Sequence, residues 1–472
     1  MSRRGAGKDT GGAPGGEPAD VTSGEAAGRA VSGDEGKAAS GAALDEVLRS
    51  LLLRGLPQAE VLVKRGRSRR LEVGLGSESS LSSQERAWAV RAGTRRAAFF
   101  LAGTGDPWVA GPWPEPAGSP FELPQPAEAP PWSEPSDFGA PLIGEREGLA
   151  LLGALGRDLA GELPGARLLR GVLEDGSSEG ELASSRGLRA RFRRRVATLF
   201  LHAAGPGRPA AAASLYLAAR EARRFAPKAL ARRLADRLSV EATARPPAEG
   251  GGEVLLAPPV GARLLAGLLP LFVGPEAAHR LAGLRDPRGR AASERMTLID
   301  NGRLPGGALE SALDGEGVPC REVALIEGGT FRQPLLAWWQ SGGAPALASG
   351  CSRRPGWRDL PRPGPTHLYV APDPRLSVGA LLGAIERGHY LIDSTGPGWF
   401  DLTGDRFSLP VCGFEVARGR ASAPVGRARL AGSIGALLKG IAAVARDLAF
   451  LPLDGLIGAP TLLVTGLEVA AW

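Results

Sequence analysis

Large apolar side chains are nearly absent from the first forty residues and then recur in regular patterns. Residues 1–40 consist mainly of Gly, Ala, Ser, Asp and Glu. Such a segment cannot bury enough apolar surface to offset the entropy of ordering, so we predict a disordered tail. From Ala42 onwards apolar residues follow helical spacing, namely Leu44, Val47, Leu48, Leu51 and Leu52. Gly55 is placed to end this helix.

Alternating apolar and polar positions after this helix predict antiparallel strands. The predicted strands cover residues 59–63, 70–75, 87–90 and 97–101, with Gly66 in the first connection. A Pro-rich connection over residues 103–141 follows and contains Trp108, Trp113 and Trp132. A linker packed on its own domain is the favoured interpretation, and a polyproline ligand for a partner is the alternative.

Helical spacing returns over residues 149–159 and 218–240, and in the second stretch Leu230, Leu234 and Leu238 share one face. Strands are predicted between these helices, at residues 168–173, 188–192 and 197–203. The Pro/Gly run at 246–252 predicts a domain boundary. Beyond it an apolar helix starts at Val260, and short strand-like segments follow at residues 296–299, 322–326, 367–370, 414–416 and 461–464.

This pattern predicts an α+β protein in three parts. After the tail comes an N-terminal α+β domain over residues 41–245, with an antiparallel sheet and helices. A β-rich C-terminal domain over residues 250–472 completes the chain.

The net charge does not alter this prediction of the fold. The 472 residues carry a formal net charge of +7, but the Arg residues are spread along the chain and 50 acidic residues match them. In the densest cluster, Arg189, Arg191 and Arg193 alternate, as on the solvated face of a strand. We therefore predict no nucleic-acid partner. The longest apolar run, residues 264–273, is too short to span a bilayer, so we predict no membrane association.

The candidate chemistry is sparse. Cys320, Cys351 and Cys412 form no CxxC pair or disulfide framework, and no apolar stretch follows the N-terminal Arg3-Arg4. These features indicate a cytoplasmic protein. The histidines are scattered and are interpreted as satisfied or exposed rather than as metal ligands, namely His202, His279, His367 and His389.

Seven segments of the C-terminal half resemble segments of the TldD/PmbA family, in the same order. They are MTLIDNG (296–302), PTHLYVAP (365–372), IERGHY (385–390), LTGDRFS (402–408), GFEVARG (413–419), PV with LAG (424–432) and GAPTLLV (458–464). In the second segment His367 replaces the usual Asn. The turn Ser184-Ser185-Arg186-Gly187 is similar to the family's NSxG turn.

The resemblance, on the PmbA/TldE side of the family, implies a two-subunit metalloprotease system that acts on unfolded or modified peptides. TldD-type subunits carry an HExxxH zinc helix and a Cys near the C-terminus, whereas PmbA/TldE-type subunits lack both and assemble with TldD. Aligned through residues 254–258, the zinc-motif positions fall on Ala266, Gly267 and Leu271. None of these can bind zinc or transfer a proton. No Cys follows Cys412.

We therefore expect a non-catalytic PmbA/TldE-like subunit with no metal or other cofactor of its own, and zinc in a TldD-like partner. A stand-alone peptide-binding or scaffold paralogue is the alternative, and a homodimer is a further possible assembly. Candidate contacts with peptide or partner are Asp300, Asn301, Gly302, Gly404, Asp405, Trp338 and Trp339. For the two Trp residues core packing is the favoured interpretation.

Overall fold

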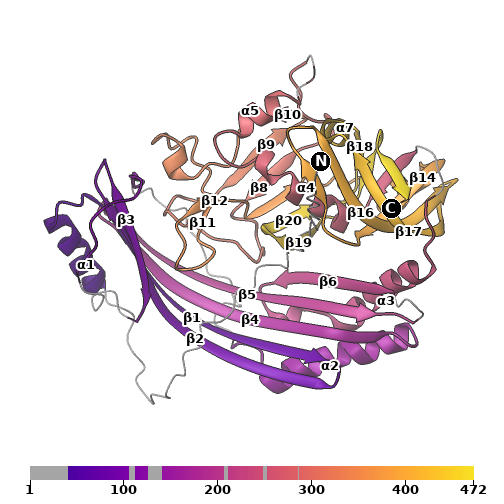
Figure 1. The fold of residues 1–472 in the computed structure, drawn as a ribbon, viewed down its shortest axis with the longest axis horizontal. Coiled ribbons are helices and arrows are strands. Elements are labelled where there is room, and N and C mark those ends of the chain that lie inside the picture. Colours follow the sequence, from indigo (N-terminus) through magenta and orange to yellow (C-terminus); the bar gives the residue numbers. More distant parts are fainter. Residues whose placement is uncertain are drawn as a thin grey trace, which may run out of the picture.

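The computed structural model describes residues 41–105, 112–125, 141–206, 211–247, 252–284, 286 and 288–471. The predicted tail, Trp108 and Trp132 lie outside these residues. A long curved sheet lies against a group of shorter strands and helices that contains the C-terminus (Figure 1). The predicted α+β class is confirmed. No helix in the described ranges is long and apolar enough to cross a membrane.

The long sheet is antiparallel and has the strand order β3-β2-β1-β4-β5-β6. Its strands are β1 (Gln58–Gly74), β2 (Ser77–Gly93), β3 (Ala98–Thr104), β4 (Arg167–Ser184), β5 (Arg189–Ala204) and β6 (Ala212–Ala219). The predicted breaks within β1 and β5 are wrong. Gly66 is paired with Glu85 on one side and Ser178 on the other, so ladder hydrogen bonds continue the strand where its apolar alternation stops.

Three helices accompany this sheet, namely α1 (Gly41–Leu53), α2 (Glu145–Glu162) and α3 (Pro227–Thr243). α2 and α3 pack against each other and cover one sheet face. The predicted burial of Leu230, Leu234 and Leu238 is confirmed. The predicted helix over residues 218–226 is wrong, because β6 ends there and a 3-10 turn, η2 (Ala222–Arg224), precedes Pro227 at the start of α3.

The C-terminal half contains two larger sheets. One has the order β10-β9-β8-β13-β20-β19, and the other has the order β18-β21-β7-β14-β16-β17-β22, with β15 paired to β16. The strands are β7 (Glu253–Leu256), β8 (Leu298–Asn301), β9 (Glu322–Glu327), β10 (Thr330–Phe331), β11 (Ser352–Arg353), β12 (Arg362–Pro363), β13 (His367–Val370), β14 (Arg387–Ser394), β15 (Trp399–Asp401), β16 (Arg406–Ala417), β17 (Arg420–Gly432), β18 (Ile441–Val444), β19 (Ala449–Leu453), β20 (Gly455–Ala459), β21 (Leu462–Val464) and β22 (Glu468–Ala471). The helices are α4 (Pro258–Gly267), α5 (Ala277–Ala282), α6 (Val378–Gly383) and α7 (Ile434–Lys439), with 3-10 turns η3 (Leu269–Leu271) and η4 (Trp338–Gln340).

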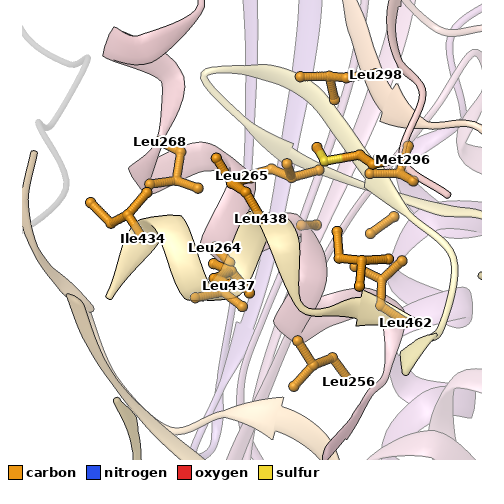
Figure 2. Packing of buried hydrophobic residues seen from close by; sticks show 14 of the residues in the cluster. Leu256, Leu264, Leu265, Leu268, Met296, Leu298, Ile434, Leu437, Leu438 and Leu462 are labelled. Carbon is orange, nitrogen blue, oxygen red and sulfur yellow. The ribbon is translucent and has the colours of Figure 1, made fainter. Parts of the chain in front are cut away.

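Helix α4 lies between these two sheets. It contacts β19 and β20 of one sheet and β7 and β14 of the other. Its residues Leu264 and Leu265 face Leu437 and Leu438 of α7 in the main apolar core (Figure 2). The helix that the resemblance aligns with the zinc motif is therefore held on several sides by aliphatic packing.

The described part of the Pro-rich connection packs on the long sheet. The Trp113 ring stacks on Phe99 at 6.5 Å and meets Trp88 edge-on at 6.4 Å. The backbone N–H of Leu123 donates to Oε1 of Gln58 (3.0 Å). For residues 112–125 the packed-linker interpretation is confirmed.

Candidate functional site

The segment aligned with the zinc motif is split between two elements. Two prolines open α4, the helix ends at Gly267, and Pro270 lies in the separate 3-10 turn η3. Pro cannot continue the i→i−4 ladder because it lacks an N–H. Ala266 therefore lies in α4 and Leu271 in η3, whereas a zinc motif needs one regular helix to aim both ligands at one ion.

An aromatic ring fills the space beside the second motif position. A Cβ at Gly267 would lie 2.2 Å from Cε2 and Cζ of Phe400, which stacks on Phe407 at 6.3 Å. Leu271 is buried in the same core, and Ala266 packs against it. Neither the donor set nor the space fits a zinc ion. Among the described residues no group of three or more His, Cys, Asp and Glu side chains could hold a metal.

The predicted contact residues of β8 are held inside the protein. Asp300 and Asn301 are 2% and 7% exposed. The Asp300 carboxylate accepts the backbone N–H of Thr366 (2.8 Å), and burial raises the pKa of Asp300 to about 7. The Asn301 amide donates to the Glu322 carboxylate (2.8 Å). At Gly302 a Cβ would meet Cβ of Cys320 at 2.9 Å.

The turn between β15 and β16 holds two further candidates. Asp401 accepts the backbone N–H of Gly404 (2.8 Å), which closes the turn. Asp405 has a φ of 56° and accepts the N–H of Gly435 (2.8 Å) in the first turn of α7. Gly404 is exposed and Asp405 is half-buried, and their contact with a peptide or partner stays a prediction.

The two adjacent Trp residues differ in burial. Trp338 is 6% exposed and packs with Val318 and Ala348, so the core interpretation is confirmed for this residue. Trp339 is 49% exposed. The predicted contacts come from β8, the β15–β16 turn and η4, and their joint contact with a peptide or partner stays a prediction.

A cavity of about 1140 Å³ lies where the long sheet meets the C-terminal half. β4, β5, β6 and α3 line one side, and α4, β14, β16 and β19 line the other. The ion pair between Arg237 and Asp393 (2.7 Å) crosses this junction, with both side chains 12% exposed. The sequence analysis missed this site. Arg233 and Arg237 on α3 could have indicated it, because their i, i+4 spacing places two cations on one helix face.

Burial dominates the electrostatics of this junction. Burial raises the pKa of Asp393, although the charge of Arg237 opposes this shift. Burial also lowers the pKa of Arg237, although the charge of Asp393 opposes that shift. A smaller adjoining cavity of about 230 Å³ brings Glu241, Arg263 and Cys412 to the pair. Burial and then Asp393 raise the pKa of Cys412 to about 12, so this thiol stays protonated and is not an activated nucleophile. Within the described ranges, the acidic, His and Cys side chains around these cavities form no cluster that could hold a metal ion.

Comparison with known proteins identifies a family for the C-terminal half and solved structures of similar fold for most of the chain. A model of the PmbA/TldA metallopeptidase C-terminal domain matches residues 249–471. The chain is similar to the metalloprotease TldD homologues of two Buchnera aphidicola strains, with 27% and 24% identity over 160 residues. That segment is 34% of this chain and 33% of each relative, so the chain matches about a third of the length of these curated relatives.

Two solved structures have the same fold over most of the chain. TldE from Thermococcus kodakarensis is 18% identical, covers 91% of this chain and 100% of its own, and gives a TM-score of 0.79. A candidate modulator of a DNA gyrase from Thermotoga maritima is 17% identical, covers 91% and 99%, and gives 0.76. These likenesses establish a TldE-like fold.

Proposed function

Because the chain belongs to the PmbA/TldD metallopeptidase family through residues 249–471, we propose that it is the non-catalytic, TldE-like subunit of a cytoplasmic TldD-type zinc protease. The observation that carries the proposal is the Phe400 ring, which takes the space that a side chain at Gly267 would need. Zinc and the general base then belong to a TldD-like partner. The substrates are unfolded or modified peptides.

In this assembly the chain binds and positions peptide rather than cleaving it. The cavity of about 1140 Å³ between the long sheet and the C-terminal half is large enough for several peptide residues. Its walls combine apolar rings, such as Phe200 and Phe414, with the Arg237–Asp393 pair. This mixture suits an extended chain with varied side chains.

We place the partner contact at the β15 edge. Within the described residues β15 is paired only with β16, and its Trp399 is 57% exposed. An exposed aromatic residue on an edge strand is typical of a protein interface. A stable contact would bury about 1,200 Å² or more and would include the neighbouring Gly404 turn.

The test is co-purification of the full chain with an HExxxH-bearing relative from the same organism. We expect the isolated chain to hold no stoichiometric zinc and to cleave no peptide, measured by elemental analysis after dialysis and by hydrolysis of an unfolded polypeptide. The complex should cleave, and a chelator should abolish that cleavage. Replacing the HExxxH glutamate of the relative by Gln should leave the complex intact but inactive.

A pair of surface variants tests the interface. Trp399→Ser should weaken association at least about tenfold, the effect expected of a central aromatic contact. Leu53→Ser changes a side chain that is 83% exposed on the distant α1 and should change nothing. Chelator-insensitive cleavage by the isolated chain would reject the proposal. Failure to bind any HExxxH-bearing relative would favour the stand-alone peptide-binding alternative.

A further inference from the structure

A second hollow lies between the long sheet and the loops 311–315 and 352–357. Two cavities of about 300 and 260 Å³ share the lining residues Arg194, Arg353 and Arg354, and Lys64 lines the first. We call this hollow the arginine groove and define it by these four residues.

The alternation of β5 brings a cation into the groove. Leu199 and Leu201 belong to the core under α2 and α3, whereas Ala190 and Phe192 pack in a smaller cluster that contacts Leu313 of the C-terminal half. Arg194 follows Phe192 by two residues and therefore lies on the same sheet face. A charge thus takes a position where the pattern would place an apolar side chain.

Two of the four cations of the groove are paired with carboxylates, Arg353 with Asp454 and Arg354 with Glu60, whereas Arg194 is not. Among the described residues Arg194 has no hydrogen-bond or carboxylate partner. Arg353 donates to Asp454 (2.7 Å), but its Nε is buried with no partner in the same part of the chain. The carboxylate of Asp314 already accepts three backbone N–H groups, and burial raises the pKa of Asp314 to about 7.

The cations also repel one another. Arg194 keeps contact with solvent along the groove, yet the surrounding protein desolvates its guanidinium. This desolvation lowers the pKa of Arg194, Cys320 opposes the shift, and the charge of Arg353 adds to it. Burial lowers the pKa of Lys64 as well, Glu85 opposes the shift, and Arg194 adds to it. An anion in the groove would relieve this repulsion.

We propose that the arginine groove binds a carboxylate of an acidic peptide, with Arg194 as the principal contact. The planar guanidinium suits a carboxylate, which it can engage with two parallel N–H donors. The rings of Phe192 and Trp357 line the same hollow, so apolar atoms next to the carboxylate also find contacts. That the carboxylate belongs to a peptide rests on the proposed function.

The test uses the full chain without any partner. Labelled eight-residue peptides carry two adjacent Glu or two adjacent Gln, each with a free or an amidated C-terminus, and fluorescence anisotropy measures their binding. We expect a carboxylate, on Glu or at the free C-terminus, to make a peptide bind at least about tenfold more tightly than the amidated Gln peptide. If only the free C-terminus matters, the carboxylate is terminal and the proposal stands; if only Glu matters, it is a side chain.

Arg194→Gln is the decisive variant, and Arg146→Gln is its control because Arg146 is exposed on α2. Arg194→Gln should remove the preference for carboxylate peptides and keep or raise the melting temperature, because it removes a repelled charge. Arg146→Gln should keep the preference. Equal binding of all four peptides, or an unchanged preference in folded Arg194→Gln, would overturn the proposal. Assembly with a TldD-like subunit is measured separately, so either proposal can fail alone.

Discussion

Gly267 lies so close to Phe400 that even one methyl group would overlap the ring. We predict that Gly267→Ala lowers the free energy of unfolding by about 1–3 kcal/mol, the usual cost of overpacking a core. Alanine's higher helix propensity would return only about 0.5–1 kcal/mol of this loss. Urea unfolding of the two proteins gives the difference.

Gly161 in α2 is the matched control, because a Cβ there would meet no atom within 4 Å. Gly161→Ala should therefore stabilise the protein by about 0.5–1 kcal/mol. If both substitutions stabilise the protein, the Phe400 ring can move aside at little cost. Its packing then does not explain why position 267 carries no metal-binding side chain.

His367 is a buried neutral imidazole. Its Nδ1 lies 2.8 Å from the carbonyl oxygen of Asn301 and donates to it, and its Nε2 accepts the backbone N–H of Leu309 (3.3 Å). Burial lowers the pKa of His367 from 6.5 to about 4. Between these pH values the unfolded chain binds the extra proton, so stability is lost as the pH falls from about 6.5 towards 4.

We predict that His367 contributes about 3 kcal/mol to this acid loss, at about 1.4 kcal/mol per pKa unit. The measurement is urea unfolding from pH 4 to 7 for the wild type and His367→Asn. Asp300 titrates with the opposite sign, because its pKa is raised to about 7, but it is present in both proteins. Parallel pH profiles for the two proteins would contradict the assignment.

At the scale of elements, α3 joins the two halves of the molecule. It packs against α2 and β6 on one side and contacts β16 and β17 on the other. Leu234, 1% exposed, lies in the core under the long sheet. We predict that Leu234→Ala costs about 2–5 kcal/mol in urea unfolding, because it leaves a cavity. Arg232→Ala on the exposed side of the same helix should cost less than about 0.5 kcal/mol.

Apolar periodicity predicted elements where it was unbroken and failed where another interaction took over. The core face of α3 followed from Leu230, Leu234 and Leu238. The middle of β1 is polar and contains Gly66, so the pattern stopped, although pairing with β2 and β4 continues the strand through it. Cross-strand hydrogen bonds are long-range contacts, and a local pattern does not contain them.

The candidate site divides in the same way. Contiguous motifs predicted the C-terminal domain, and their alignment showed that Ala266, Gly267 and Leu271 occupy the zinc-motif positions. The cavity around Arg237 and Asp393 was missed because its walls come from α3 and β14, more than a hundred residues apart in the sequence. No spacing rule connects such positions, and only the packing of the two halves brings them together.

At the scale of the whole molecule, a buried ionic network connects the long sheet to the C-terminal loops. Arg91 forms an ion pair with Glu60 (2.9 Å), Glu60 also pairs with Arg354, and Arg91 lies 3.8 Å from Glu316. Although burial opposes the shift, the two Arg residues hold the pKa of Glu60 below its usual value. In this network the charges of Arg91 and Arg354 are therefore paired with carboxylates, in contrast to that of Arg194 in the arginine groove.

Ion pairs also offset much of the positive charge behind the net charge of +7. On the Arg-rich strand β5, Arg191 lies 3.6 Å from Glu181, Arg193 lies 3.6 Å from Glu179, and Arg195 is buried against Asp175 at 3.2 Å. Binding to nucleic acid needs a patch of cations that can release counterions from the phosphates, and paired cations contribute little to it.

We therefore predict no DNA or RNA binding tighter than about 1 µM at about 150 mM salt, the range of non-specific contacts. Fluorescence anisotropy with duplex DNA and single-stranded RNA measures this, with the acidic peptide of the groove as the positive control. A nanomolar dissociation constant that rises steeply with salt would contradict the prediction. It would also mean that the cations of β5 leave their carboxylates for phosphates, so the net charge, not its pairing, would decide which polyanions this protein binds.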